Sequence, residues 1–398
     1  MLNTIGRYAN QHHYNIPPTK SKVICYGSAK NHRTNTWNLS DNIIELSNET
    51  THLGLKRSSK KENEVNIEDR VKSARRTKYA LMNSGLHGTN GLSPKISYTI
   101  YRTYVLPRLL YGLEILSLTK TQIQILERFH IGTLRAIQAL ATRTAKPAVY
   151  LLLGVLPVEA EIHKRKLTFL HSLTTCSNNK IKRNHQQTNC TKYNLPDIFD
   201  KNIPIPSKLS WKKLVKTEIS SFWTLRLKEE AHQMSSLKFL NLNFGNADST
   251  HPVWDSVEQN LIEIRKASTK VRMLTGTYMV QADKHKFSQY TIDPTCLLCH
   301  REIEDILHVL TQCPVLCNER KEYFTPIKQL VTENSPPGTW ELLFNNKLAV
   351  TQLVLDCTKY MKQLGFKEEL ILKLETLTRH FCFKLHYKRI SLLKKLDG

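Results

Sequence analysis

The amino-acid sequence predicts a mainly α protein with a small α+β segment at its N-terminus. Glycine is sparse, with 14 among 398 residues, and long stretches rich in leucine and isoleucine dominate the chain. From residue 66 onward apolar side chains recur near helical spacing, whereas short β-prone runs gather near the N-terminus. Hydrophobic residues make up 40% of the chain, and its length favours two or three domains with cores of their own.

The first part of the chain, residues 1–58, contains the elements expected for the α+β segment. A short helix is expected first, because apolar residues share one side of it until two consecutive prolines interrupt the chain. β-prone runs follow, separated by polar stretches. The expected elements are a helix at 2–14 and extended segments at 21–26, 43–46 and 51–55.

Residues 59–175 are predicted to form a helical subdomain. Apolar side chains recur at helical spacing along most of it, and residues typical of helix N-termini precede two of the periodic runs. A proline is expected to end the second helix. The expected helices begin near Asn66, run from the N-cap Ser93 through Pro94 to Pro107, follow the N-cap Thr119 over 119–142, and cover 158–175.

The remainder of the chain divides into a linker and a second helical domain. Residues 176–208 are rich in Asn, Lys, Gln and Pro and show little apolar periodicity, which is typical of a linker. Over 209–398 we expect a helix around 255–275 and a final amphipathic, basic helix from Lys367 to Leu396. The cations of that last helix that we expect to be available to solvent or phosphate are Arg379, Lys384, Lys388, Arg389, Lys394 and Lys395.

The charge balance points to a polyanionic partner. Lysine and arginine total 58 residues against 34 acidic ones, a net charge of +24. Such an excess repels itself and attracts polyanions, of which nucleic acid is the most common. The alternative is a solvated basic surface without a partner.

The sequence shows neither a membrane span nor a secretory signal. The most apolar stretch, residues 148–158, contains a glycine and a proline and is shorter than the roughly 20 residues that a span requires. The N-terminus has no apolar core of the kind found in signal peptides. We therefore expect a nuclear or cytoplasmic protein, in which the nine cysteines are thiols or metal ligands rather than disulfides.

The sharpest chemical pattern is a group of metal-ligand residues at about 290–320. Cys296 and Cys299 can grip one metal from a tight turn, and His308 and Cys313 follow at a spacing that suits a short helix and its end. Four soft ligands with no open position predict a structural Zn²⁺ site of the Cys-Cys-His-Cys kind. Cys317 and His300 are competing ligands, and a set of buried thiols beside an unrelated histidine is the alternative.

Several sequence blocks, taken in order, resemble the C-terminal part of reverse transcriptases of non-LTR (LINE-type) retrotransposons. These blocks are TKSKVICYG at 19–27, THLGL at 51–55, YVLPRLLYGLEIL at 104–116, LLLGVLPVEAEIHKRKLTFL at 151–170, VRMLTGTY at 271–278, and CLLC with the later HVLTQCP. The resemblance implies a palm remnant at 1–58, a thumb-like subdomain at 59–175 and a zinc-binding region within 209–398. It also implies that Lys20 or Lys22 matches the palm lysine near the incoming nucleotide.

The chain departs from that family at the polymerase chemistry. Nucleotidyl transfer needs carboxylates that hold two metal ions, and the sequence contains no Asp-Asp pair and no substitute motif. We therefore expect no catalytic residues, and a chain that starts after the catalytic hairpin, is inactive by itself and uses Mg²⁺ only if a catalytic palm is supplied. The alternatives are an active polymerase whose palm is missing from a truncated gene model or lies on another polypeptide, and a decayed element without function.

The expected function is therefore to grip nucleic acid, with RNA, DNA or the element RNA as partners. Basic residues in the thumb-like blocks and beside the zinc pattern would contact phosphates, and Tyr278, Phe287 and Tyr290 could stack on bases. The residues predicted to contact nucleic acid are Lys20, Lys22, Arg70, Lys72, Arg75, Arg76, Lys164, Arg165, Arg272, Lys284 and Lys286.

Overall fold

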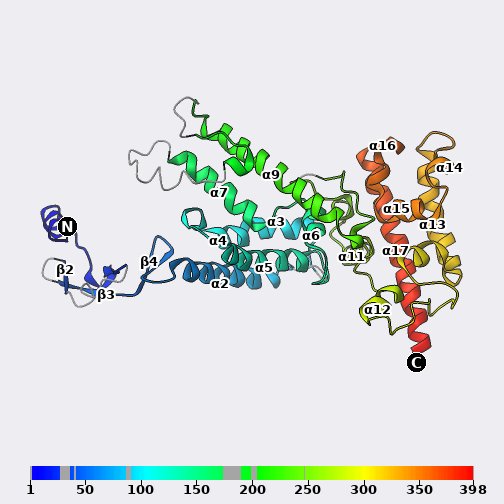
Figure 1. Ribbon diagram of the computed structural model, residues 1–398, viewed down its shortest axis with the longest axis horizontal. Coiled ribbons are helices and arrows are strands. Elements are labelled where there is room, and N and C mark those ends of the chain that lie inside the picture. Colours follow the sequence, from blue (N-terminus) through cyan, green and yellow to red (C-terminus); the bar gives the residue numbers. More distant parts are fainter. Residues whose placement is uncertain are drawn as a thin grey trace.

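The computed structural model describes residues 2–26, 36–39, 42–86, 91–173, 190–198, 204–245 and 247–397. The fold is mainly helical, which confirms the predicted fold class at that level. Figure 1 shows an elongated molecule with the N-terminal strands at one end, α2 to α9 in the middle and α17 at the opposite end. None of the helices in the described ranges combines the length and the apolar character that a membrane crossing requires.

The N-terminal unit is a small sheet with one helix against it. The central strand pairs in parallel with the first strand and antiparallel with the second, so the order is β1-β3-β2. The predicted extended run at 21–26 forms only a two-residue strand. The elements are α1 (Leu2–Gln11), β1 (Lys22–Val23), β2 (Trp37–Leu39) and β3 (Asn42–Leu46).

A β-hairpin connects this sheet to the helical body. It consists of β4 (Glu49–His52) and β5 (Leu55–Ser58), paired antiparallel. Leu53 and Gly54 form its turn, both with positive φ, so the Leu-Gly pair predicted to be extended instead reverses the chain. The hydroxyl of Tyr111 donates to the carbonyl of Leu53 at 2.9 Å, which anchors the hairpin on the helical body.

The middle of the molecule is a bundle of helices around a buried apolar core. The predicted N-cap Thr119 is confirmed, because its hydroxyl accepts from the N–H of Gln122 while the Gln122 side chain accepts from the N–H of Thr119. The helix of residues 146–153 was not predicted. The helices are α2 (Glu62–Met82), α3 (Pro94–Ile100), α4 (Leu106–Leu110), α5 (Lys120–Ile137), α6 (Lys146–Leu153), α7 (Val158–Ser172) and α9 (Lys208–His232).

The expectation that Pro107 ends its helix is wrong. A π-helical turn at Tyr101–Val105 joins α3 to α4, and the helix continues to Leu110. The wider turn offsets the missing N–H of Pro107, which then lies in the first turn of α4, where proline is tolerated. Ser93 precedes α3 without capping it through its side chain, and its hydroxyl instead accepts from Gln259 at 2.9 Å.

Part of the predicted linker is packed against the helical body. Residues 190–198 are described, and Tyr193, Leu195 and Ile198 are buried in a small core between α7 and α9. Trp211 and Trp223 of α9 complete that core. Most of the other residues of the predicted 176–208 linker lie outside the described ranges, and the proposed domain boundaries remain predictions.

The C-terminal part surrounds the long helix α17, which packs against α11 and α13. The amphipathic character predicted for this helix is confirmed by its apolar stripe, in which Leu374, Phe381 and Leu385 are buried. Short 3-10 turns link several of the elements. The helices are α10 (Pro252–Asp255), α11 (Leu261–Leu274), α12 (Gln281–Phe287), α13 (Cys317–Glu333), α14 (Thr339–Leu343), α15 (Lys347–Leu355), α16 (Met361–Leu364) and α17 (Glu368–Asp397).

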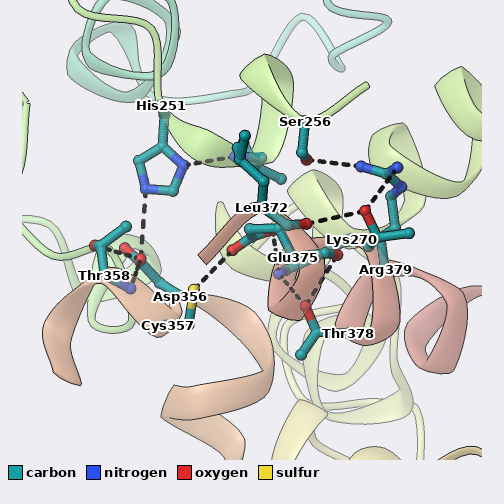
Figure 2. A network of polar contacts seen from close by, with 12 residues as sticks. His251, Ser256, Lys270, Asp356, Cys357, Thr358, Leu372, Glu375, Thr378 and Arg379 are labelled. Carbon is teal, nitrogen blue, oxygen red and sulfur yellow. Dashed lines mark hydrogen bonds and ion pairs between the residues drawn. The ribbon is translucent and has the colours of Figure 1, made fainter. Parts of the chain in front are cut away.

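Two cations of α17 that were expected to face solvent are buried instead. The Arg379 side chain is 2% exposed, and its guanidinium donates to Glu263 of α11 at 2.8 Å. It also donates to the hydroxyl of Ser256 at 2.7 Å (Figure 2). Arg389 is 3% exposed and pairs with Glu304. The amphipathic pattern missed both residues, because a buried cation is stable where an acid from another element meets it.

A buried ion pair connects α11 to α17. Lys270 and Glu375 have side chains that are 0% exposed, and the Lys270 ammonium donates to Glu375 at 2.6 Å and to the Thr378 hydroxyl at 2.7 Å. The thiol of Cys357 also donates to Glu375, at 3.4 Å. Figure 2 shows these side chains meeting between the two helices. Each charge is compensated inside the core, so removal of one partner leaves the other uncompensated.

A second buried pair, between His251 and Asp356, holds the chain around α10 against the end of α15. The Nε2 atom of His251 lies 3.4 Å from Asp356, while its Nδ1 atom accepts from the N–H of Val253. Asp356 also accepts from the N–H of Asn241 and from Thr358. Burial raises the pKa of Asp356, but His251 and these hydrogen bonds outweigh burial and lower the pKa to about 2.

Removal of the Lys270 ammonium should destabilise the fold strongly. We expect Lys270→Ala to lower the free energy of unfolding by about 3–5 kcal/mol, because Glu375 would remain charged and buried without its partner. Arg226→Ala is the matched control, since Arg226 pairs with Glu230 at the surface, and should cost at most about 1 kcal/mol. Denaturant unfolding measures both changes, and equal losses would contradict a special role for the buried pair.

Stability should also fall in acid through Asp356. Its folded-state pKa of about 2 lies below the ordinary value of 3.8, so its contribution is complete above 3.8 and disappears as the pH falls through about 2. That contribution is roughly 2 kcal/mol, at 1.36 kcal/mol per pKa unit. The difference in unfolding free energy between wild type and Asp356→Asn should therefore narrow over this interval. If the difference in unfolding free energy stays constant over this pH interval, the pKa of Asp356 is not lowered in the folded protein.

Candidate metal centre

Four side chains with soft ligand atoms converge between α12 and α13. One ligand atom from each of Cys296, Cys299, His308 and Cys313 lies within 4.8 Å of the others, so the group could hold a metal ion. Cys296, His308 and Cys313 are buried and Cys299 is half-buried. These are the four predicted ligands, brought together by the fold.

The two competing ligands lie outside this group. Cys317 is an exposed thiol at the first residue of α13, and His300 is exposed on the turn that follows Cys299. Neither belongs to the cluster of potential metal ligands found among the described residues. The geometry therefore favours Cys313 and His308 as the third and fourth members of the set.

A tight hairpin presents the first two cysteines. The N–H of Cys296 donates to the carbonyl of Glu302 at 2.9 Å, and the N–H of His300 donates to the carbonyl of Cys296 at 2.8 Å. Thr295 and Ile303 form an antiparallel bridge at the open end of the turn. Because these backbone hydrogen bonds close the loop, the sulfur atoms of Cys296 and Cys299 are both directed toward the other two ligands.

Backbone N–H groups donate to the sulfur atoms, whereas burial opposes their thiolate forms. Burial raises the pKa of Cys296 to about 12, although the N–H groups of Cys299 and Leu298 donate to its sulfur. Burial also acts against the Cys299 thiolate, but donation from the N–H groups of Arg301 and Glu302 contributes to a pKa below the usual value. A bound cation would add to these donors and deprotonate the buried thiols outright.

The ring of His308 is oriented by a carboxylate. Its Nδ1 atom lies 3.1 Å from a Glu302 carboxylate oxygen, and its Nε2 atom lies 3.5 Å from the sulfur of Cys299. Proton donation from Nδ1 to Glu302 leaves the lone pair of Nε2 directed at the sulfur cluster, which is the arrangement typical of a metal-binding histidine. Asp305 accepts from the N–H of His308 at 2.7 Å and so caps the helical turn that carries it.

Glu304 connects the metal-ligand loop to the C-terminal helix. Its two oxygens accept from the guanidinium of Arg389 at 2.8 and 2.7 Å, and it also accepts from the N–H of Gln281 at 2.9 Å. Burial raises the pKa of Glu304, but Arg389 outweighs burial and the pKa is lowered. The Cys296 thiol lies 3.8 Å from the same carboxylate. A residue of α17 thereby supports the loop that holds the ligands.

Three of the four predicted nucleic-acid contacts on α2 are accessible. Lys72, Arg75 and Arg76 are exposed, and none of them has an acidic partner among the described residues. Arg70 differs, because its side chain is 12% exposed, pairs with Asp69, donates to the carbonyl of Gly54 and lies over the ring of Tyr111. Arg70 therefore braces the β4–β5 hairpin instead of facing a ligand.

The predicted contacts outside α2 lie in the N-terminal unit, on α7 and around α12. Lys20 is exposed in the N-terminal unit, and neighbouring Lys22 pairs with Glu45 at 3.5 Å. On α7, Lys164 pairs with Glu161 at 3.0 Å and Arg165 is half-buried.

The remaining predicted basic contacts lie around α12, beside the metal-ligand loop. Lys284 and Lys286 are exposed on this helix, and Arg272 at the end of α11 is also exposed. Arg143 is not among the predicted contacts, and its guanidinium lies 5.1 Å from the ring centre of Phe287. Only the fold brings this residue near α12.

The three aromatic candidates differ in their surroundings. Phe287 and Tyr290 are 67% and 71% exposed, so their rings are accessible. Tyr278 is 8% exposed, and its hydroxyl contacts His386 at 3.0 Å and Arg389 at 3.5 Å. The expectation that Tyr278 stacks on a base is therefore not supported by its position, because its ring belongs to the core.

Comparisons with known proteins identify no relative. No protein-family model matches the chain, and no curated protein or solved structure matches it either.

Substitution of a ligand should separate the four-residue set from its competitor. We expect about one metal ion per chain in elemental analysis of the purified protein, and a large loss of it in Cys299→Ser, because a structural site needs all four ligands. Cys317→Ser is the matched control and should retain the metal, since Cys317 lies outside the cluster. Equal loss in both variants would contradict the proposed ligand set.

Proposed function

We propose that the Cys296, Cys299, His308 and Cys313 group is a structural Zn²⁺ site. Three sulfurs and one imidazole nitrogen form a soft donor set of the kind that Zn²⁺ prefers. All four positions are supplied by the protein, which leaves none open for a substrate and argues for a structural role. The ion would tie together the hairpin, the helical turn at 308–312 and, through Glu304, the C-terminal helix.

We infer that the chain grips nucleic acid as the C-terminal portion of a non-LTR retrotransposon reverse transcriptase. The observation that carries the proposal is the basic face of α2, where Lys72, Arg75 and Arg76 are exposed without acidic partners among the described residues. Three cations within two helical turns suit the phosphates of a template–primer duplex. The net charge of +24 and the ordered family blocks support the same partner.

The thumb-like role of residues 59–175 and a place in the nucleus or cytoplasm are parts of this proposal. Gripping would be non-catalytic, because the sequence contains no Asp-Asp pair to hold the metal ions of a polymerase. The protein would contact phosphates and sugars, so it should show little sequence preference.

A second candidate function is participation in an active RNA-directed DNA polymerase whose catalytic palm is supplied outside this chain. One observation favours it, namely that β3 of the N-terminal sheet leaves Ile43 69% exposed and Leu46 38% exposed. Apolar side chains on a small sheet are better satisfied when a further layer covers them. Mg²⁺ would then belong to that palm.

Binding of a primer–template duplex should weaken steeply with salt and depend on α2. We expect the Arg75→Gln/Arg76→Gln double variant to reduce the slope of log affinity against log salt by about 2, because each phosphate that a cation neutralises contributes about 0.9 to that slope. The matched control is Lys61→Gln/Arg226→Gln, because these exposed cations already pair with acids and should change the slope less. Fluorescence anisotropy across a salt series measures both slopes.

Two results would contradict the proposal. One is an affinity that does not change between low and high salt, since phosphate contacts always release counterions. The other is an equal effect of the two double variants, which would assign binding to overall charge and not to the face of α2.

A further inference from the structure

One side of α9 forms an open groove that none of the predicted sites includes. Its volume is about 650 Å³, and it has lysines toward both ends with hydroxyl side chains between them. The outermost lysines, Lys213 and Lys228, are about 22 Å apart along the helix axis at a rise of about 1.5 Å per residue. The groove residues used below are Lys213, Lys216, Thr217, Ser221, Lys228 and Asp248.

Asp248 lies at the edge of this groove among three cations from three different elements. Its carboxylate accepts from Lys216 of α9 at 2.6 Å and lies 3.7 Å from Arg102 of the π-helical turn. Burial raises the pKa of Asp248, but Lys216, Arg102 and Lys164 of α7 outweigh burial and lower it, so the carboxylate is charged at neutral pH. Lys164 itself also pairs with Glu161.

The backbone holds Asp248 firmly in this position. Its φ is +71°, and its N–H donates to the carbonyl of Gly154 at 2.7 Å. Gly154 also has positive φ, and a Cβ atom there would lie 2.3 Å from the carbonyl oxygen of Ser249, so only glycine permits this approach. Three residues after Asp248, the backbone N–H of His251 donates to the carbonyl of Leu152. This hydrogen bond ties the same loop to α6.

The charges around the groove are only partly compensated. Lys213 and Lys228 have no acidic partner among the described residues, while Lys216 shares Asp248 with Arg102. The side chains of Arg102, Lys216 and Asp248 are 58%, 57% and 41% exposed, so their ion pairs face water and are weak. An incoming anion can therefore replace the carboxylate at little cost.

We propose that the α9 groove binds the phosphate backbone of a nucleic-acid strand, with Asp248 as an internal counter-ion that competes with a phosphate for Arg102, Lys164 and Lys216. This inference rests on the proposed function, because it assumes that nucleic acid is the partner. Lysines at both ends suit phosphates that are several nucleotides apart on one strand, and the Thr217 and Ser221 hydroxyls between them can donate to phosphate oxygens.

The composition of the groove indicates recognition of the backbone and not of bases. No aromatic side chain is among the described residues that line it, so bases have no ring on which to stack. Lysine and hydroxyl groups contact phosphate and sugar without reading sequence. The groove should accept different sequences with similar affinity.

The test uses the full chain and a labelled homopolymer oligonucleotide, with affinity measured by anisotropy across a salt series. We expect Lys213→Gln/Lys228→Gln to reduce the magnitude of the salt slope by about 1.4, at about 0.7 for each phosphate of a single strand. Lys208→Gln/Lys212→Gln is the matched control, because both lysines lie on α9 outside the groove residues, and it should leave the slope unchanged. Thermal melting checks that the variants fold alike.

Asp248→Asn provides an independent arm with the opposite sign. Asparagine tolerates positive φ, so the loop should keep its conformation. Removal of the competing charge should raise affinity by up to about five-fold, the factor that corresponds to one exposed ion pair. Lower or unchanged affinity in this variant would overturn the counter-ion role.

The remaining outcomes separate this inference from the proposed function. If Lys213→Gln/Lys228→Gln weakens binding but Arg75→Gln/Arg76→Gln does not, the assignment of binding to the α2 face is wrong. The proposal that the α9 groove binds nucleic acid is then supported. If the α2 variant weakens binding while the two α9 double variants behave alike, the groove is overturned and the proposed function stands. Binding of heparin but of no oligonucleotide would overturn both.

Discussion

The bidentate contact between Arg389 and Glu304 is the interaction on which the metal-ligand region depends. Both side chains are almost fully buried, and each would be costly alone. Glu304 also accepts from the N–H of Gln281, at the start of α12, and lies beside the Cys296 sulfur. One carboxylate thus fixes the start of α12, the hairpin of the first two ligands and the end of α17. A bound metal would lock a loop that this contact has already aligned.

The same helix uses two further buried pairs to position the rest of the C-terminal part. Lys270 of α11 meets Glu375, and Arg379 meets Glu263, so α17 is held to α11 at successive turns. Burial of three pairs along one helix makes its placement specific, because sliding or rotation would leave several charges uncompensated. The apolar stripe of α17 provides the hydrophobic contacts with its neighbours. The ion pairs determine the position and rotation of the helix in which those contacts form. The ion pairs of α17 therefore position both the metal-ligand loop and the helix itself.

Local patterns explain what could be predicted from the sequence. The four metal ligands lie within one short segment, and Thr119 caps its own helix through Gln122, so neighbouring residues carry both signals. The errors concern partners that are distant in sequence. Arg379 meets an acid 116 residues away and Arg389 one 85 residues away, so periodicity alone placed both at the surface. Pro107 was misjudged for a different, local reason, because a π-helical turn changed the backbone directly ahead of it.

These pairings change the meaning of the net charge. Lys270, Arg379 and Arg389 each take an acid in the interior, so the buried cations contribute nothing to the excess of positive charge. The excess therefore belongs to the surface, where Lys72, Arg75 and Arg76 of α2 and Lys213 of the α9 groove are exposed without an acidic partner among the described residues. Charge placed where water screens it adds little to folding stability and opposes compaction. This surface charge instead affects association with other molecules. It attracts most strongly a polymer, such as nucleic acid, that carries a negative charge on each repeating unit.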